Sequence, residues 1–552
     1  MKKTSLKWLF SHYRRRIPAI VLLMAAQVGH SLLAVFFALG TRGVIDGAVT
    51  GDRSVFYQAC LHQAAIILGI LVCATVTRHL RERLRADLDW DWKKRLLHGL
   101  LHGDYAAVSS YHSAELLNRL NNDVNKLNEA ILTILPTALA MATRLTAAVL
   151  VLGVLDGRFT LIIAALGCVA IVATGMMRRR LKDLNKRVSE HDGVVSGFLQ
   201  ETLEKLLMVQ TMDVSREVER RADVLLEERY RIQRKRKNIS LITHAGTLVM
   251  LYGAGFLALV WCSSLMLQGK MSFGSLSAVL SLVNQIQSPL TNLSSVLPQY
   301  VAALAAAERL MELDQIQGDP APVGEDPQDM YRRMDSIHAE RLSFAYDRNP
   351  ILTDAEFTLP KGAFAVITGP SGIGKSTLLK LLLGVYRPGA GRLYLSGEKG
   401  ELTLDRSTRR LFAYVPQGNL LLSGTLRENL TIIKPDATDE EIAQALHIST
   451  MEDFLPQLPQ GLDTVLGESG AGLSEGQAQR LAIARAVLGG APVLLLDECT
   501  SALDARTEEI VLRRLQSLPG KTCIAVTHRP AAVELCDWEL RVCDGKIRAI
   551  QK

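Results

Sequence analysis

The stretch from Gly369 to Thr377 holds the residues whose types and spacing most clearly indicate chemistry. It lies between an apolar run at 363–368 and a helical pattern at 378–383, and its spacing fits the phosphate-binding loop Gly-x-x-x-x-Gly-Lys-Ser. Glycines let successive backbone N–H groups face inward as a nest for phosphate oxygens, and the following helix directs its positive end at the same oxygens. A chance glycine loop is the alternative, because short motifs carry false positives. The expected contacts to a nucleotide are Gly369, Pro370, Ser371, Gly372, Ile373, Gly374, Lys375, Ser376 and Thr377.

Two carboxylates end an apolar strand pattern farther along the chain. The run Val493–Leu496 suits a strand buried on both faces, and Asp497 and Glu498 follow it. Ligands bind at the carboxyl ends of strands in open α/β sheets, so both acids are placed for the same nucleotide. We expect Lys375 to reach the β- and γ-phosphates, Ser376 and Asp497 to hold Mg²⁺, and Glu498 to polarise the attacking water as general base. A solvated strand end is the alternative.

Several other positions gain meaning only beside these motifs. Tyr346 could stack on a nucleobase, although an aromatic there is more often an ordinary strand residue. Gln417 and His528 each end an apolar, strand-like run. The run Ser474-Glu475-Gly476-Gln477 precedes a long helical pattern at 478–488, so it forms a second helix N-terminus suited to phosphate.

Together and in this order, the motifs resemble those of the nucleotide-binding domain of ATP-binding cassette (ABC) transporters. Tyr346 resembles the A-loop aromatic, Gly369–Thr377 resembles Walker A, and Gln417 resembles the Q-loop glutamine. Farther along, Leu473–Gln477 resembles the signature and Asp497–Glu498 the end of Walker B. Ser501–Asp504 resembles the D-loop, and His528 the switch histidine. It implies ATP and Mg²⁺ as cofactors, Glu498 and His528 as catalytic residues, and Gln417 as a further metal ligand. It also implies nucleotide contacts from Tyr346, Gln417, Ser474, Gly476, Gln477 and Asp504.

The signature departs from the family pattern at one position. The usual sequence is Leu-Ser-Gly-Gly-Gln, and Glu475 replaces its first glycine. A carboxylate near a helix N-terminus favours the helix dipole, but it would repel a phosphate at which it pointed, so we expect Glu475 to point away. Some two-chain exporters carry altered motifs on one partner, and Glu475 therefore leaves a heterodimer open. The intact Glu498 argues that the ATP site of this chain is catalytic.

The elements that precede this region have the composition of a membrane domain. The chain has 552 residues, 48% hydrophobic and 22% charged, with a mean hydropathy of +0.15. Such values suggest strongly apolar segments beside strongly charged ones. A spanning helix needs roughly 20 apolar residues. Six segments are expected to span, with no cleavable signal peptide before them: 17–39, 55–77, 131–155, 160–177, 240–267 and 275–296.

Basic residues flank the spans on one side only. They precede the first and fifth spans and follow the second and fourth, which places the N-terminus in the cytoplasm by the positive-inside rule. The net charge of +7 suits this clustering better than a nucleic-acid partner. The long loops at 78–130 and 178–239 show helical spacing, so we expect extended helices that turn back near 104–113 and 208–215. A disordered loop is disfavoured, because leucines recur throughout.

Polar residues inside the spans allow two interpretations. Amides such as Gln27 and Gln285, and histidines such as His30, can form hydrogen bonds between helices, and we favour that interpretation for them. Arg144 lies near the middle of the third span, where a charge is costly and usually faces a water-filled cavity or a partner. We therefore expect Arg144 to line a polar translocation pathway.

The resulting fold prediction is a six-helix transmembrane domain followed by an α/β P-loop domain. The expected bounds are 1–313, a proline-rich acidic linker at 314–336, and 337–552, with the resemblance covering nearly the whole chain. It implies an ATP-driven exporter half-transporter in a bacterial cell membrane, with its nucleotide-binding domain in the cytoplasm. The partner is a second copy or a related half-transporter, and the substrate is a lipid, an amphipathic drug or a peptide-like solute. The rival interpretations are an ATP-gated channel or sensor that does not transport and, remotely, an ATPase acting on nucleic acid.

Overall fold

The structure is a computed structural model that divides into two units. It describes residues 8–9, 11–316, 318, 325–347, 349–398, 400–418, 421–467, 472–527 and 529–552. One unit comprises Met1–His98 with Ser113–Gln315, and the other comprises Gly99–His112 with Ile316–Lys552. A short excursion from the helical half of the sequence therefore packs as part of the second unit.

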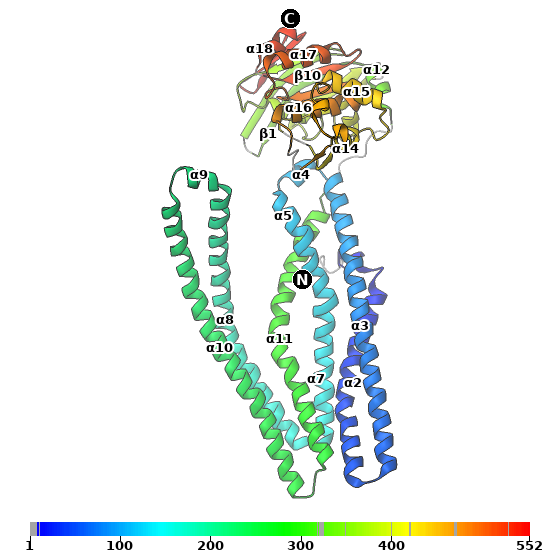
Figure 1. Cartoon of the computed structure of the whole chain (residues 1–552), viewed down its shortest axis with the longest axis vertical. Coiled ribbons are helices and arrows are strands. Elements are labelled where there is room, and N and C mark those ends of the chain that lie inside the picture. Colours follow the sequence, from blue (N-terminus) through cyan, green and yellow to red (C-terminus); the bar gives the residue numbers. More distant parts are fainter. Residues whose placement is uncertain are drawn as a thin grey trace. The chain divides into compact units, whose positions relative to one another are not determined.

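The first unit is built from long helices. They are α2 (Ile17–Thr50), α3 (Arg53–His102), α7 (Leu135–Leu155), α8 (Gly157–Glu204), α10 (Ser215–Leu267) and α11 (Phe273–Asp314). Between α3 and α7 come α4 (Tyr105–Ser109), α5 (Ser113–Asn118) and α6 (Val124–Glu129), with π-helical turns at Arg119–Asp123 and Ala130–Ile134. Helices α8 and α10 run side by side, and α9 (Leu206–Thr211) closes their tip (Figure 1). The predicted reversals near 104–113 and 208–215 are confirmed at α4 and α9.

Five of the six predicted spans lie within one of these long helices, and the span at 131–155 covers α7 and most of the π-helical turn before it. Among the described residues, four helices are long and apolar enough to cross a membrane: Ile17–Thr50, Arg53–His102, Ser113–Leu155 and Ser215–Leu267. The apolar stretch Gly157–Gly167 is shorter. A helical transmembrane domain is therefore present, and the number of six spans stays a prediction.

Small residues hold the helices of this unit together. Ala38, Ala148 and Ala258 are fully buried in one cluster with Phe159 and Leu282. Helices approach closely where side chains are small, which is how packing is achieved when lipid tails remove most of the hydrophobic driving force.

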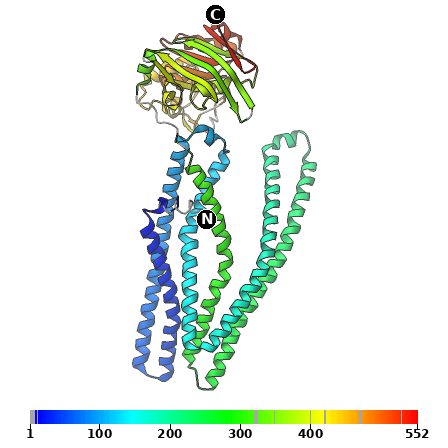
Figure 2. The ribbon, with the colours of Figure 1, turned by 180° about the vertical axis from the view of Figure 1, so that it is seen from behind.

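The second unit contains three sheets, the smallest of which pairs β7 (Gly424–Thr425) with β8 (Val465–Leu466). A four-stranded antiparallel sheet has the order β2 (Asn349–Pro360), β1 (Met334–Tyr346), β4 (Ala390–Gly397) and β5 (Gly400–Thr403). A six-stranded sheet has the order β12 (Lys546–Gln551), β11 (Trp538–Cys543), β3 (Phe364–Thr368), β10 (Thr522–Val526), β9 (Val493–Asp497) and β6 (Phe412–Val415). All its pairings are parallel except β12 with β11. Figure 2 shows the long strands of the antiparallel sheet side by side.

Helices cover the six-stranded sheet, and strand β9 shows how the core is divided. Leu495 faces the core that also holds the antiparallel sheet and α13 (Lys375–Leu382). Leu494 and Leu496 face the opposite core, with α16 (Glu475–Leu488) and α17 (Ala505–Gln516). Side chains alternate across a strand, so a continuous apolar run serves both cores at once. The remaining elements are α12 (Pro327–Arg333), α14 (Leu426–Thr431), α15 (Asp439–Ile448) and α18 (Pro530–Leu535).

Candidate functional site

The phosphate-binding loop lies between the end of β3 and the start of α13. Gly369, Gly372 and Gly374 have φ of 149°, 79° and 109°, values that favour glycine. A Cβ on Gly374 would come within 2.4 Å of Ile351 Cγ2, and one on Gly369 within 2.7 Å of the Val542 carbonyl oxygen. Both glycines are therefore required by conformation and by space, as the motif predicts.

Lys375 is folded back over this loop. Its side chain is buried, and its ammonium donates to the carbonyl oxygens of Gly369 at 3.0 Å and Pro370 at 2.9 Å. Burial lowers the pKa of Lys375, while the nearby carboxylates of Glu498 and Asp497 oppose that shift. The ammonium thus stands at the mouth of the loop, where phosphate oxygens can replace the two carbonyls.

Asp497 joins the loop to the end of β9. The Ser376 hydroxyl donates to Asp497 Oδ1 at 2.9 Å, and the Tyr414 hydroxyl donates to Oδ2 at 3.1 Å. Burial raises the pKa of Asp497, and the two hydroxyl donors act against this by stabilising the ionised form. A hydroxyl and a carboxylate are hard oxygen ligands, so this pair fits Mg²⁺.

Glu498 has a strained backbone at the same strand end. Its φ is 47°, in the left-handed region that non-glycine residues rarely adopt, and its N–H donates to the Val526 carbonyl at 3.0 Å. Gln417 Nε2 donates to Glu498 Oε2 at 2.8 Å. The structure thus brings Gln417, Asp497 and Glu498 together beside the loop. His528 lies outside the described residues.

Tyr346 lies at the end of β1, in a cluster of aromatic rings. Its ring meets Tyr386 edge-on at 5.4 Å and Phe344 edge-on at 5.0 Å, and its hydroxyl is 3.3 Å from Thr377 Oγ1. The Tyr386 ring also meets Tyr105 of α4 edge-on, with ring centroids 6.0 Å apart. With 37% of its surface exposed, Tyr346 retains ring area for a base while the cluster fixes its position.

The signature residues form a helix cap. The Ser474 hydroxyl accepts from the Gln477 N–H, and the Gln477 side chain accepts from the Ser474 N–H, which closes a capping box on α16. A Cβ on Gly476 would come within 2.9 Å of the Ala502 carbonyl oxygen. Glu475 is an exposed residue in the first turn, which favours the helix dipole.

The D-loop is bonded to the same helix. Gln479 donates to Ser501 Oγ at 3.1 Å and accepts from the Ala502 N–H at 3.1 Å. Asp504 caps α17 by accepting from the Thr507 N–H, a contact that lowers the pKa of Asp504. Throughout 473–477, no hydrogen bond or ion pair joins the signature to the loop at 369–377.

Sequence reasoning missed three residues of this site. Tyr414 precedes the Q-loop by only a few positions, Tyr386 follows α13, and Gln479 lies one turn into α16. Each matters through a partner that is distant in sequence, so no local spacing could reveal it.

Polar residues in the helical unit also have defined partners. Gln27 donates to Thr137 Oγ1 at 3.2 Å, and Gln285 donates to the Ala34 carbonyl at 2.9 Å. These bonds join α2 to α7 and α11 to α2, so the interhelical interpretation is confirmed for both amides. Arg144 Nε is buried and has no hydrogen-bond partner among the described residues.

Comparisons with known proteins agree across the chain. The family described as "ABC transporter transmembrane region" matches residues 17–290, and "ABC transporter" matches residues 352–501. A rat protein named "Mitochondrial potassium channel ATP-binding subunit" is 28% identical over 92% of this chain and 71% of its own length. A Staphylococcus aureus (strain NCTC 8325) protein, named as a multidrug export ATP-binding/permease protein, is 27% identical over 97% of this chain and 94% of its own.

A solved structure supports the same fold. The structure of a bacterial Atm1-family ABC exporter with ATP bound shares a TM-score of 0.76 and 23% identity, over 98% of this chain and 95% of that one. The transmembrane and ATP-binding regions are thus fused in one polypeptide, as they are in exporter half-transporters. This chain therefore belongs to the ABC transporters, as an exporter-type half-transporter whose ATPase is coupled to transport.

Proposed function

We propose that the chain works as a dimer whose two ATP sites are each shared between chains. The observation that carries this proposal is the isolation of the signature from the phosphate-binding loop. Gly476 lies against the D-loop residue Ala502, and none of the residues 473–477 forms a hydrogen bond to 369–377 in the same chain. A capped helix N-terminus is useful to a γ-phosphate only if one reaches it, and a second copy can supply that phosphate.

The residues divide into roles under this proposal. Tyr346 would stack on the base, and the loop at 369–377 would bind the phosphates. Ser376 and Asp497 would hold Mg²⁺, with Gln417 nearby, and the metal would neutralise charge on the phosphates. Glu498 would accept a proton from the attacking water, which Gln417 and the fixed strand end help to position. His528 completes the proposed catalytic set, and Ser474, Gly476, Gln477 and Asp504 would act on the partner's nucleotide.

The membrane half would carry the solute. We propose that residues 1–313 form the transmembrane domain, that 314–336 links it to the ATPase at 337–552, and that the short excursion at 99–112 docks on the ATPase unit. The N-terminus and ATPase would face the cytoplasm of a bacterial cell. The multidrug-export relative supports an amphipathic substrate, such as a lipid, drug or peptide-like solute.

Mixed dimers test the shared sites. Lys375→Ala removes the loop's cation, and Ser474→Arg blocks the signature. A homodimer of either variant should have two broken sites. A mixed dimer should keep one intact site, because the intact Lys375 and intact Ser474 then lie on different chains. Nucleotide occlusion, measured in a Glu498→Gln background, reports whether an intact site is present without requiring turnover. Occlusion that returns only on mixing supports shared sites, whereas none after confirmed mixing counts against them.

The channel-subunit relative favours a second candidate, in which ATP gates a conductance or serves a sensor. The two candidates differ in whether a solute is moved. ATP-dependent accumulation of an amphipathic solute in inverted vesicles, with turnover stimulated by that solute, is expected for the exporter. ATP-dependent ion flux without solute-stimulated turnover would favour the channel.

A further inference from the structure

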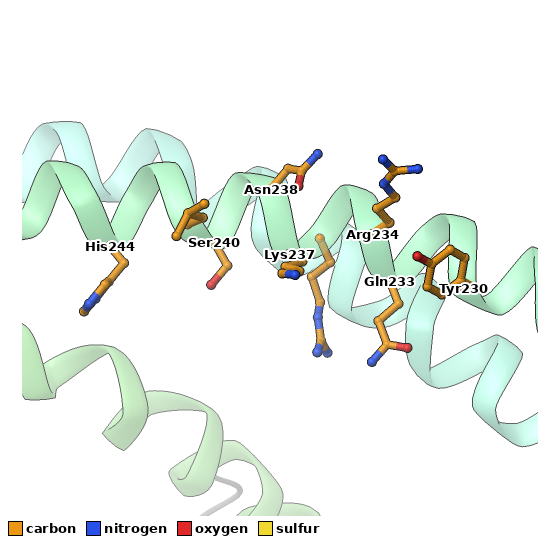
Figure 3. Close-up of a pocket in the computed structure, with 9 residues that line it drawn as sticks. Tyr230, Gln233, Arg234, Lys237, Asn238, Ser240 and His244 are labelled. Carbon is orange, nitrogen blue, oxygen red and sulfur yellow. The ribbon is translucent and has the colours of Figure 1, made fainter.

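Helix α10 carries a groove of about 930 Å³ on one face (Figure 3). All of its lining residues belong to this helix, and at about 100° per residue they form a broad stripe that covers about 200° of its circumference. They are Tyr230, Gln233, Arg234, Arg236, Lys237, Asn238, Ser240, Leu241 and His244. In the close-up the Gln233, Ser240 and His244 side chains extend to one side of α10, and Arg234 and Asn238 extend to the other.

The cations of this stripe differ from several cations nearer the start of α10. Nearer its start, Arg220 pairs with Glu217, Arg229 with Asp192, and Arg231 with Glu227. By contrast, Arg234, Arg236 and Lys237 make no ion pair or hydrogen bond with any described residue. The chain thus neutralises the first part of the helix, whereas the four consecutive cations at 234–237 have no counter-ion among the described residues.

The stripe continues as an apolar face. Leu241, Leu248, Tyr252 and Leu259 follow Lys237 at helical spacing, and each has at least 37% of its surface exposed. These residues lie in the apolar part of a helix long enough to cross a membrane. Arg234, Lys237 and Asn238 therefore adjoin a continuous apolar surface on the same side of α10.

We propose that this stripe is a binding site for an anionic amphipath, a molecule with a phosphate, sulfate or carboxylate head and an apolar tail. Arg234 and Lys237 would bind the head, Asn238 would donate a hydrogen bond to it, and the tail would lie on Leu241 and the residues beyond. The inference rests on the proposed exporter function and narrows its substrate class. A membrane lipid and a transported solute share this chemistry.

Charge substitutions on α10 provide a matched test. Lys235 lies two positions from Lys237, about 200° round the helix, and is outside the groove. Lys237→Gln and Lys235→Gln therefore change the same charge on the same helix, but only the first changes the stripe. Each variant would be purified as the full chain in phosphatidylcholine nanodiscs. Binding of dodecyl phosphate would be measured by equilibrium dialysis without ATP, with empty nanodiscs subtracted.

We expect Lys237→Gln to weaken binding about fivefold, the factor typical of one basic residue at a membrane surface. The double variant at 234 and 237 should weaken binding by about 25-fold on the same basis. Lys235→Gln should stay within about twofold of wild type, and dodecyltrimethylammonium should bind only as well as it does to empty nanodiscs. Equal losses for Lys235→Gln and Lys237→Gln, or saturable binding of the cationic probe, would overturn the site.

Two further measurements identify the source of the ligand and separate this proposal from the exporter function. Phosphatidic acid in the nanodisc should displace dodecyl phosphate if lipid head groups fill the stripe, and should leave it bound if the site selects a solute. Transport is measured separately, as ATP-dependent accumulation in inverted vesicles. Binding that depends on Lys237 without accumulation would refute the exporter function and leave the site standing. ATP-dependent accumulation together with dodecyl phosphate binding that is unchanged in Lys237→Gln would refute only the proposed site.

Discussion

Replacing Glu498 with glutamine should separate nucleotide binding from hydrolysis. The amide matches the carboxylate in size, and Gln417 can still donate to its oxygen, so the local geometry at the end of β9 should persist. What disappears is the proton acceptor. A positioned general base contributes about 10²–10⁴-fold to a rate, and we expect Glu498→Gln to lose turnover within that range, ~3–5 kcal/mol in barrier height.

Binding should not weaken in the same variant. The Glu498 carboxylate acts electrostatically on Lys375, so its removal takes one negative charge away from the position of the phosphates. Mg-ATP affinity should therefore equal or exceed that of wild type. Lys375→Ala should behave in the opposite way, because it removes the cation bonded to Gly369 and Pro370 at the mouth of the loop.

The assay compares radiolabelled ATP binding with phosphate release under saturating Mg-ATP. Glu475→Gln is the matched control, because it makes the same chemical change on an exposed residue of the same unit. In the homodimer, the turnover of Glu475→Gln should exceed that of Glu498→Gln by at least tenfold. Wild-type turnover by Glu498→Gln, with correct folding shown by unchanged nucleotide binding, would refute the assignment of the base.

Three further outcomes are expected. Cysteines placed in 40–54 should react with an impermeant thiol reagent on intact cells and one at Asn122 should not; the reverse labelling would discard the topology. A cysteine at Arg144 should react with a small polar reagent at a rate that changes on ATP trapping, and an unreactive cysteine in both states would remove Arg144 from the pathway. Tyr414→Phe should move the acidic limb of the ATPase profile to higher pH by up to about one unit, because losing the hydroxyl donor raises the pKa of Asp497, which must be ionised to hold the metal. An unchanged acidic limb would show that Asp497 does not set it.

The phosphate-binding loop was predictable because its requirements are local. Gly369 and Gly374 have positive φ in the turn that joins β3 to α13, and this requirement belongs to the loop itself. Their close approach to Val542 and Ile351 is a further, tertiary reason for glycine. The apolar run of β9 likewise predicted a strand buried on both faces. A strand with one exposed face would alternate apolar and polar residues instead of forming a continuous apolar run. Spans in the membrane half were readable because the bilayer requires apolar length.

Contacts that depend on tertiary packing were not predictable. Tyr414 contacts Asp497 from a neighbouring strand, and Tyr386 contacts Tyr346 from the segment between α13 and β4. Nothing in their local sequence specifies those partners. The groove on α10 was likewise hidden, because the sequence shows that Arg234 and Lys237 are basic but not that they lack a counter-ion among the described residues.

The assignment of 99–112 to the ATPase unit has a consequence for how the chain can be cut. The polypeptide passes between the two units three times, after His98, His112 and Gln315, so no single cleavage separates the halves into complete pieces. A fragment that starts at Ile316 would lack Tyr105 and the His102 carbonyl, which accepts from Arg406 at 2.9 Å. Such a fragment would expose one edge of Tyr386 to water. A synthetic peptide of residues 99–112 should therefore bind the isolated ATPase half and make it more stable than the fragment alone.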